Sequence, residues 1–224
     1  STTNAVRAGW LKSTQATKHL LNQSLLLNKM TDESLSPAER FARAKANKPD
    51  PSIENFAKLL KFPMDPFQEQ SCRALAKGKG VLVAAPTGAG KTIVGEFAIH
   101  LAIEKDQKVF YTTPIKALSN QKFAELTKRY GAERVGLLTG DTNQNSDAQI
   151  VVMTTEVLRN MIYANSNSLI SLGYVVMDEV HYLADRFRGA VWEEVILHLP
   201  KDVKIVSLSA TVSNAEEFGA WLDE

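Results

Sequence analysis

The sequence lacks the features that mark secreted and membrane proteins. It has one cysteine, Cys72, so no disulfide can form within the chain, and no Cys/His cluster has the spacing of a zinc site. No apolar run approaches the ~18 residues that a membrane-spanning helix needs. At a helix-interior position, Cys72 is expected to be a small buried hydrophobe. These absences favour a cytoplasmic protein with no membrane partner.

The sequence also has almost no net charge. Its 26 Lys and Arg residues and 25 Asp and Glu residues leave a formal charge of +1, which argues against a histone-like polyanion-binding protein. The balance is uneven, because residues 1–29 contain four bases and no acid. A length of 224 residues with 44% hydrophobic content is enough for one large folded domain, so disorder of the whole chain is excluded.

The first 50 residues differ from the rest and are expected to form an N-terminal extension, helical or partly disordered. Residues 1–29 are rich in Ser, Thr, Asn and Lys, and two interpretations stay open: an organellar transit peptide or a loosely attached helical segment. The run Ser36-Pro37-Ala38-Glu39 predicts a helix that begins at Ser36 and ends near Asn47.

From Pro66 onward, apolar strand candidates alternate with helical segments. Continuous Val/Ile runs are typical of strands buried on both faces, and the alternation predicts a parallel sheet with right-handed crossovers. We expect one doubly wound α/β domain over residues 51–224, with helices on both faces of a mostly parallel sheet. The predicted strands are 80–85, 108–112, 135–138, 149–153, 173–178 and 203–208, and the predicted helices are 52–60, 66–77, 91–105, 115–129, 155–163, 190–198 and 214–222.

The strongest motif is residues 85–92, Ala-Pro-Thr-Gly-Ala-Gly-Lys-Thr, which follows an apolar strand and opens a helix. Gly88 and Gly90 allow backbone N–H groups to turn towards phosphates, while Lys91 reaches the outer phosphates. The Thr92 hydroxyl can bind Mg²⁺. The alternative is a glycine-rich turn without a ligand. The predicted nucleotide-binding residues of this loop are Pro86, Thr87, Gly88, Ala89, Gly90, Lys91 and Thr92.

Two acids, Asp178 and Glu179, end the strand predicted at 173–178. The carboxyl ends of strands in an α/β sheet face the ligand crevice. Asp178 is therefore expected to hold Mg²⁺, and Glu179 to orient and activate the attacking water. The alternative is that both acids only complement a helix dipole.

The segment 85–92 together with Asp178-Glu179-Val180-His181 resembles the DExH-box branch of superfamily 2 helicases, in which Ala also occupies the first position of the loop. Ser209-Ala210-Thr211 is similar to that family's coupling motif. The fuller resemblance, over roughly residues 55–224, is to the Ski-like group and most of all to the HelY-type bacterial helicases. The stretches that carry it are 112–122, 138–141, 154–160 and 188–194.

This resemblance implies a RecA-like domain of an ATP-dependent helicase that couples ATP hydrolysis, with Mg²⁺, to 3′-to-5′ movement on RNA or DNA. It implies that Phe62 stacks on adenine and that Gln68 recognises the adenine edge, as an amide can. An ordinary core aromatic is the alternative for Phe62. His181 is implied to contact the coupling strand; alone, it would be interpreted as a structural residue.

The resemblance also implies a surface that binds one strand of nucleic acid through hydroxyls, loop N–H groups and helix starts. Only two of its residues are basic, so its affinity and salt dependence should be modest. The alternative is that its threonines are helix N-caps, a role for which Thr113 and Thr155 are suited. The implied residues are Thr113, Pro114, Lys116, Ala117, Thr139, Gly140, Thr154, Thr155, Glu156 and Arg159.

In this family a second RecA-like domain closes the ATP site and supplies arginines, which are worth about 10³–10⁵ in rate in related enzymes. We therefore expect the 224 residues alone to bind nucleotide weakly, hydrolyse it very slowly and not unwind nucleic acid. A monomer is expected. Two other functions stay open: a double-stranded DNA translocase or restriction-type motor, and a non-catalytic nucleotide-gated binding module.

Overall fold

The structure is a computed structural model, and it describes residues 36, 50–180 and 189–210. All of these except Ser36 belong to one compact unit, Asp50–Ala215. The predicted helices at 36–47 and 214–222 lie outside the described residues.

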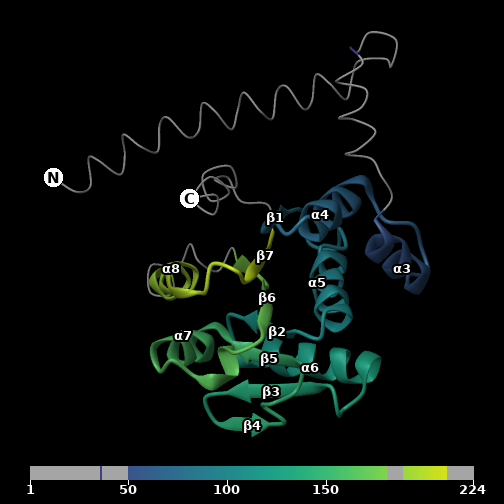
Figure 1. Cartoon of the computed structure of the whole chain (residues 1–224). Coiled ribbons are helices and arrows are strands. Elements are labelled where there is room, and N and C mark those ends of the chain that lie inside the picture. Colours follow the sequence, from purple (N-terminus) through teal and green to yellow (C-terminus); the bar gives the residue numbers. More distant parts are fainter. Residues whose placement is uncertain (1–35, 37–49, 181–188, 211–224) are drawn as a thin grey trace, which may run out of the picture. The chain divides into compact units, whose positions relative to one another are not determined.

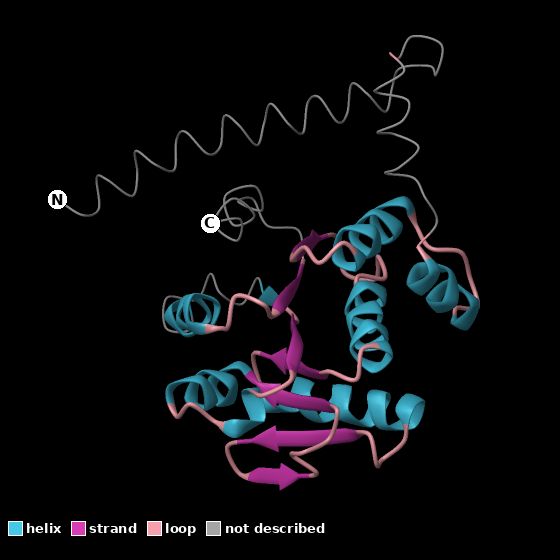
Figure 2. Cartoon of the chain, in the orientation of Figure 1, coloured by secondary structure: helices cyan, strands magenta, loops and turns pink. Residues whose placement is uncertain are grey.

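A seven-stranded sheet forms the centre of this unit (Figures 1 and 2). Its order is β1-β7-β6-β2-β5-β3-β4, and every neighbouring pair is parallel except β3 and β4. The strand bounds are β1 Val81–Ala84, β2 Lys108–Thr113, β3 Val135–Thr139, β4 Thr142–Gln144, β5 Ile150–Thr154, β6 Leu172–Met177 and β7 Lys204–Ser209.

Helices connect the strands and cover both faces of the sheet (Figure 1). Alternate residues of β2 show why both faces are apolar: Val109 and Tyr111 join the core beneath α5, while Phe110, equally buried, points to the other face. The predicted α/β class is therefore confirmed. The helix bounds are α3 Pro51–Leu59, α4 Pro66–Ala76, α5 Thr92–Glu104, α6 Lys116–Tyr130, α7 Thr155–Tyr163 and α8 Gly189–His198, with a 3₁₀ turn η2 at Asn167–Leu169.

Helix α5 lies unusually close to the sheet at Gly95. A Cβ placed there would lie 3.1 Å from a Val176 methyl and 3.3 Å from a Leu208 methyl. The missing side chain therefore sets how near the helix that follows the phosphate loop can approach β6 and β7.

Strand β4 was not predicted. It pairs antiparallel with β3 and consists of Thr, Asn and Gln, so it has no apolar signal. Directly after β4, Asn145 has a positive φ of 49°, and its side-chain amide donates to the carbonyls of Ala132, Glu133 and Val135, which ties the end of β4 to the start of β3. Asn tolerates this left-handed conformation better than most residues.

Cys72 is fully buried in α4, as predicted, and burial raises the pKa of its thiol from 9.0 to about 12. In the part of the chain that the structure describes, no helix has both the length and the apolar character needed to span a bilayer.

Candidate functional site

The loop between β1 and α5 has the backbone of a phosphate-binding loop. Gly88 and Gly90 have φ values of 85° and 77°, in the left-handed region that favours glycine. A Cβ at Gly88 would meet nothing within 4 Å, whereas one at Gly90 would lie 2.6 Å from Gln68 Nε2. The Lys91 ammonium donates to the carbonyls of its own loop, to Ala85 at 2.6 Å and to Pro86 at 3.0 Å. These carbonyls hold the lysine at the loop.

The two predicted acids follow β6, and Asp178 is fixed by three hydrogen bonds. Its N–H donates to the Thr112 carbonyl at 2.9 Å, while its carboxylate accepts from Tyr111 Oη at 2.6 Å and from the Glu179 N–H at 2.9 Å. Glu179 has a positive φ of 56°, which is costly for a residue with a side chain and is a feature of functional sites. The strand and the hydrogen bonds therefore set where both acids lie.

Tyr111 is a site residue that the sequence did not reveal. It is completely buried in β2, and burial, together with the neighbouring Asp178 carboxylate, raises the pKa of its phenol well above the ordinary value. The phenol therefore stays protonated and donates to Asp178.

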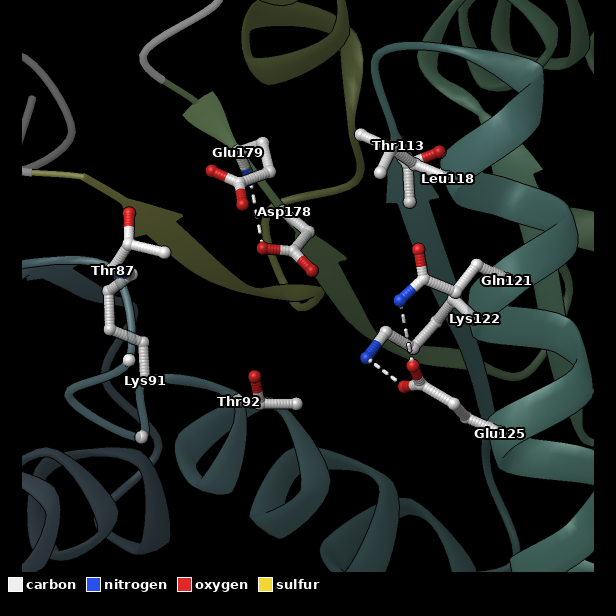
Figure 3. A pocket seen from close by; sticks show the side chains of 12 residues that line it. Thr87, Lys91, Thr92, Thr113, Leu118, Gln121, Lys122, Glu125, Asp178 and Glu179 are labelled. Carbon is white, nitrogen blue, oxygen red and sulfur yellow. Dashed lines mark hydrogen bonds and ion pairs between the residues drawn. The ribbon is translucent and has the colours of Figure 1, made fainter.

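The phosphate loop and the acids line one cavity of about 390 Å³ (Figure 3). Side chains of α6, which were not predicted to belong to the site, form the wall of the cavity opposite the loop, here called the α6 wall. In this wall Glu125 accepts from Lys122 Nζ at 2.6 Å and from Gln121 Nε2 at 3.1 Å. The lining residues are Thr87, Gly88, Gly90, Lys91, Thr92, Thr113, Leu118, Gln121, Lys122, Glu125, Asp178 and Glu179.

The donors in this cavity suit Mg²⁺ bound together with a nucleotide. Within residues 50–180 and 189–210, no three of His, Cys, Asp and Glu gather as a metal cage. The Thr92 hydroxyl and the Asp178 carboxylate nevertheless line the same cavity. One carboxylate plus substrate phosphates is the usual way in which proteins hold Mg²⁺.

The two residues predicted to contact adenine have different environments. Phe62 is 55% exposed, so the core-aromatic alternative is wrong. It lines a second cavity, of about 700 Å³, together with Ile93 of the first turn of α5. Gln68 is buried: its Oε1 accepts from the Asp65 N–H, and its Nε2 donates to the Gly90 carbonyl at 3.1 Å. In this structure its amide therefore braces the phosphate loop.

Three predicted nucleic-acid residues, Thr113, Thr139 and Thr154, end the neighbouring strands β2, β3 and β5. Thr113 is buried, and its hydroxyl bonds to Ser119 Oγ at 2.7 Å and to the Ile115 carbonyl at 3.0 Å. The Thr113 hydroxyl, which was expected to bind nucleic acid at the surface, thus makes hydrogen bonds within the protein.

The N-cap alternative for these threonines is wrong at Thr113 and Thr155, whereas Thr154 does occupy the N-cap position of α7, without a capping hydrogen bond from its side chain. The N-cap of α6 is Ile115, not Thr113, and that of α7 is Thr154, not Thr155. Thr155 instead donates its hydroxyl to the Thr113 carbonyl at 3.3 Å. These side chains tie α7 to the end of β2.

The exposed part of the predicted nucleic-acid surface contains Lys116, Ala117, Gly140 and Glu156, with Arg159 half-buried. Lys116 pairs with Asp141 at 2.5 Å, and Arg159 lies 3.7 Å from Glu194.

Of the predicted coupling residues, Ser209 ends β7 next to the phosphate loop, where its carbonyl accepts from the Ala85 N–H at 3.2 Å. Its buried hydroxyl has no hydrogen-bond partner among the described residues. Ala210 follows it, while His181 and Thr211 lie outside the described residues.

Comparison with known proteins identifies relatives of this chain. The profile of the DEAD/DEAH box helicase family matches residues 65–218. The chain is 66% identical over 170 residues to "Probable helicase HelY" of Mycobacterium tuberculosis (strain ATCC 25618 / H37Rv). The aligned residues cover 76% of this chain and 19% of that protein. It is 46% identical over 178 residues to "DExH-box ATP-dependent RNA helicase DExH15 chloroplastic" of Arabidopsis thaliana (77% and 15%). It is 47% identical over 173 residues to "Antiviral helicase SKI2" of Saccharomyces cerevisiae (77% and 13%).

The chain thus spans at most 19% of the length of these relatives. Among solved structures, the crystal structure of "DUF1998 helicase MrfA bound to DNA and AMPPNP" superimposes with a TM-score of 0.65 at 22% identity, covering 77% of this chain and 28% of that one. This likeness is in the fold.

Proposed function

This chain belongs to the DEAD/DEAH box helicase family, and we propose that it is the ATP-binding domain of a Ski-like helicase that moves 3′ to 5′ along nucleic acid. The predicted resemblance to HelY-type and Ski-like DExH helicases is confirmed by the relatives. The observation that carries the proposal is the shared cavity of the phosphate loop and the adjacent acids Asp178 and Glu179.

For nucleotide binding, we propose that the phosphates lie against the loop of residues 86–92, with Lys91 exchanging its loop carbonyls for phosphate oxygens. Thr92 and Asp178 would hold Mg²⁺, which supplies positive charge to the phosphates. Phe62 would stack on adenine. Gln68 would recognise the edge of the adenine once its side-chain amide no longer hydrogen-bonds to the phosphate loop. The two cavities support this placement because Thr92 lines one and Ile93 the other.

For hydrolysis, we propose that Glu179 orients the attacking water and accepts its proton, because phosphoryl transfer depends mainly on positioning and electrostatics. The other roles carried by the resemblance remain parts of the proposal. His181 would link the site to Ser209, Ala210 and Thr211, and a second RecA-like domain would complete it.

For the nucleic acid, we propose single-stranded RNA as the first choice, because the Arabidopsis relative is named as an RNA helicase. The strand would cross the carboxyl ends of β2, β3 and β5. Exposed groups and loop N–H groups would bind phosphates there, since several of the hydroxyls are used internally. Competition between matched single-stranded RNA and DNA would decide between the two. The proposed contacts are Thr113, Pro114, Lys116, Ala117, Thr139, Gly140, Thr154, Thr155, Glu156 and Arg159.

The proposal is tested by calorimetric titration of the chain with a non-hydrolysable ATP analogue and Mg²⁺. Lys91→Ala should weaken binding by roughly tenfold or more, because a charged contact to phosphate is lost. Glu179→Gln should bind within about twofold of wild type, yet lower ATP turnover of the full-length protein by about a hundredfold or more. Equal binding by wild type and Lys91→Ala would refute the proposed phosphate site.

A further inference from the structure

The basic residues of the proposed nucleic-acid surface are already paired with acids of the same domain. Lys116, at the start of α6, has its Nζ 2.5 Å from Asp141 Oδ2, although 25 residues separate the two along the chain. Arg159 of α7 has its Nη1 3.7 Å from Glu194 Oε2 of α8. The only two cations in the predicted contact set therefore face carboxylates.

Asp141 is held in place from two sides. Its Oδ1 accepts from the Thr139 hydroxyl at 2.9 Å and lies 3.5 Å from the Thr142 hydroxyl, while its Oδ2 accepts from Lys116. Asp141 lies in the turn between β3 and β4, and Thr139 and Thr142 are the strand residues on either side of that turn. Hydrogen bonds from Lys116 and Thr139 lower the pKa of Asp141 below its ordinary value. The carboxylate is thus ionised at neutral pH.

The Lys116–Asp141 pair lies where a polyanion can reach it. The Lys116 side chain is 47% exposed and that of Asp141 is 66% exposed. Ion pairs at such exposed positions are weak, so another anion can displace the carboxylate. A phosphate oxygen and a carboxylate oxygen offer Lys116 the same kind of charged acceptor.

We propose that Asp141 is a built-in competitor that occupies Lys116 until a phosphate of single-stranded nucleic acid replaces it, and that it thereby keeps the affinity of this surface low. The inference rests on the proposed nucleic-acid function. When a phosphate takes Lys116, the freed Asp141 carboxylate attracts a cation from solution, so fewer ions are released on binding than the contact alone would give. The Glu194 carboxylate acts on Arg159 in the same way, but across a longer distance.

The test is equilibrium binding of the 224-residue chain to a fluorescein-labelled single-stranded oligoribonucleotide over a range of salt concentrations. Asp141→Asn keeps an oxygen that accepts from Thr139 but removes the charge. We expect it to bind about three- to tenfold more tightly at low salt, with a steeper dependence on salt. A gain in affinity is not an outcome that misfolding would produce.

Asp147→Asn is the matched control, because it removes one exposed negative charge from the loop before β5, at the other end of the strands. Its effect should be less than half as large. In the Lys116→Ala background, Asp141→Asn should have no further effect. Equal tightening by the two Asp→Asn variants, or tightening without Lys116, would overturn the inference alone. Absence of binding by every variant would overturn the nucleic-acid function as well.

Discussion

The buried hydroxyl of Tyr111 is one of two donors, among the described residues, that fix the carboxylate of Asp178, which is proposed to hold Mg²⁺. The phenol donates at 2.6 Å, and burial together with the Asp178 carboxylate raises its pKa, so it is a protonated donor at neutral pH. Partners of a metal-binding carboxylate commonly matter nearly as much as the carboxylate itself, because they set its direction. Tyr111 is thus a positioning residue for the proposed metal site.

Tyr111→Phe keeps the buried ring and removes only this hydrogen bond. We expect about tenfold more Mg²⁺ to be needed for half-maximal binding of a non-hydrolysable ATP analogue, because the Asp178 carboxylate loses its orienting donor. The measurement is nucleotide binding titrated with Mg²⁺ at a constant nucleotide concentration.

Tyr174→Phe provides the control, since it too removes a phenol from a buried tyrosine of the sheet. Its hydroxyl bonds to Lys105 at the far end of α5. The Mg²⁺ requirement of this variant should match that of wild type. If both Phe variants need the same Mg²⁺ concentration as wild type, Tyr111 has no positioning role.

At the scale of elements, α5 joins the phosphate loop to the core. It begins at Thr92 in the cavity and lies against the sheet at Gly95, where Val176 and Leu208 leave little room for a side chain. The closeness of helix and sheet at this point therefore sets the position of the loop's last residues.

Gly95→Val should lower the free energy of unfolding by about 1–3 kcal/mol, because the added methyl groups push α5 away from β6 and β7. Gly140→Val makes the same chemical change where an added Cβ meets nothing within 4 Å. That control should stay within about 0.5 kcal/mol of wild type. Urea unfolding followed by circular dichroism gives both values, and equal effects would contradict the proposed close contact.

Sequence patterns predicted the elements well where the pattern is local. The buried strands are continuous apolar runs, so each observed strand other than β4 overlaps a predicted one, with ends shifted by at most one residue. The phosphate loop was predicted because its residues are contiguous. Tyr111, the α6 wall and the Lys116–Asp141 pair were not predicted, because packing and turn geometry bring together residues far apart in the chain.

At the scale of the whole molecule, several buried or partly buried side chains are weak acids whose pKa is higher in the folded chain than in the unfolded chain. Burial raises the pKa of Cys72 to about 12 and that of Tyr130 to about 12, and it raises the pKa of Tyr111 well above its ordinary value. In the unfolded chain these groups have ordinary pKa values, so above them the unfolded state binds fewer protons than the folded state.

The fold should therefore lose stability as pH rises above 9.0, the ordinary pKa of the thiol, towards 12. Each such group contributes at most about 1.4 kcal/mol per pH unit between its unfolded and folded pKa values. Urea unfolding at increasing pH measures the slope. Cys72→Ala should give a shallower slope, because the contribution of the thiol is gone. An identical slope for both proteins would show that Cys72 is not buried as described.

The short polar strand β4 also affects how copies of the protein meet one another. It ends the sheet beside β3, whose Val135 and Leu137 are buried. Without β4, the apolar strand β3 would present its backbone N–H and C=O groups to any other chain that could add a strand. With β4 in place, β3 is paired on this side over Leu137–Thr139, and Thr142, Asn143 and Gln144 form the edge of the sheet there. A short, polar edge of this kind discourages strand addition, so we expect the hairpin to lower aggregation through β3.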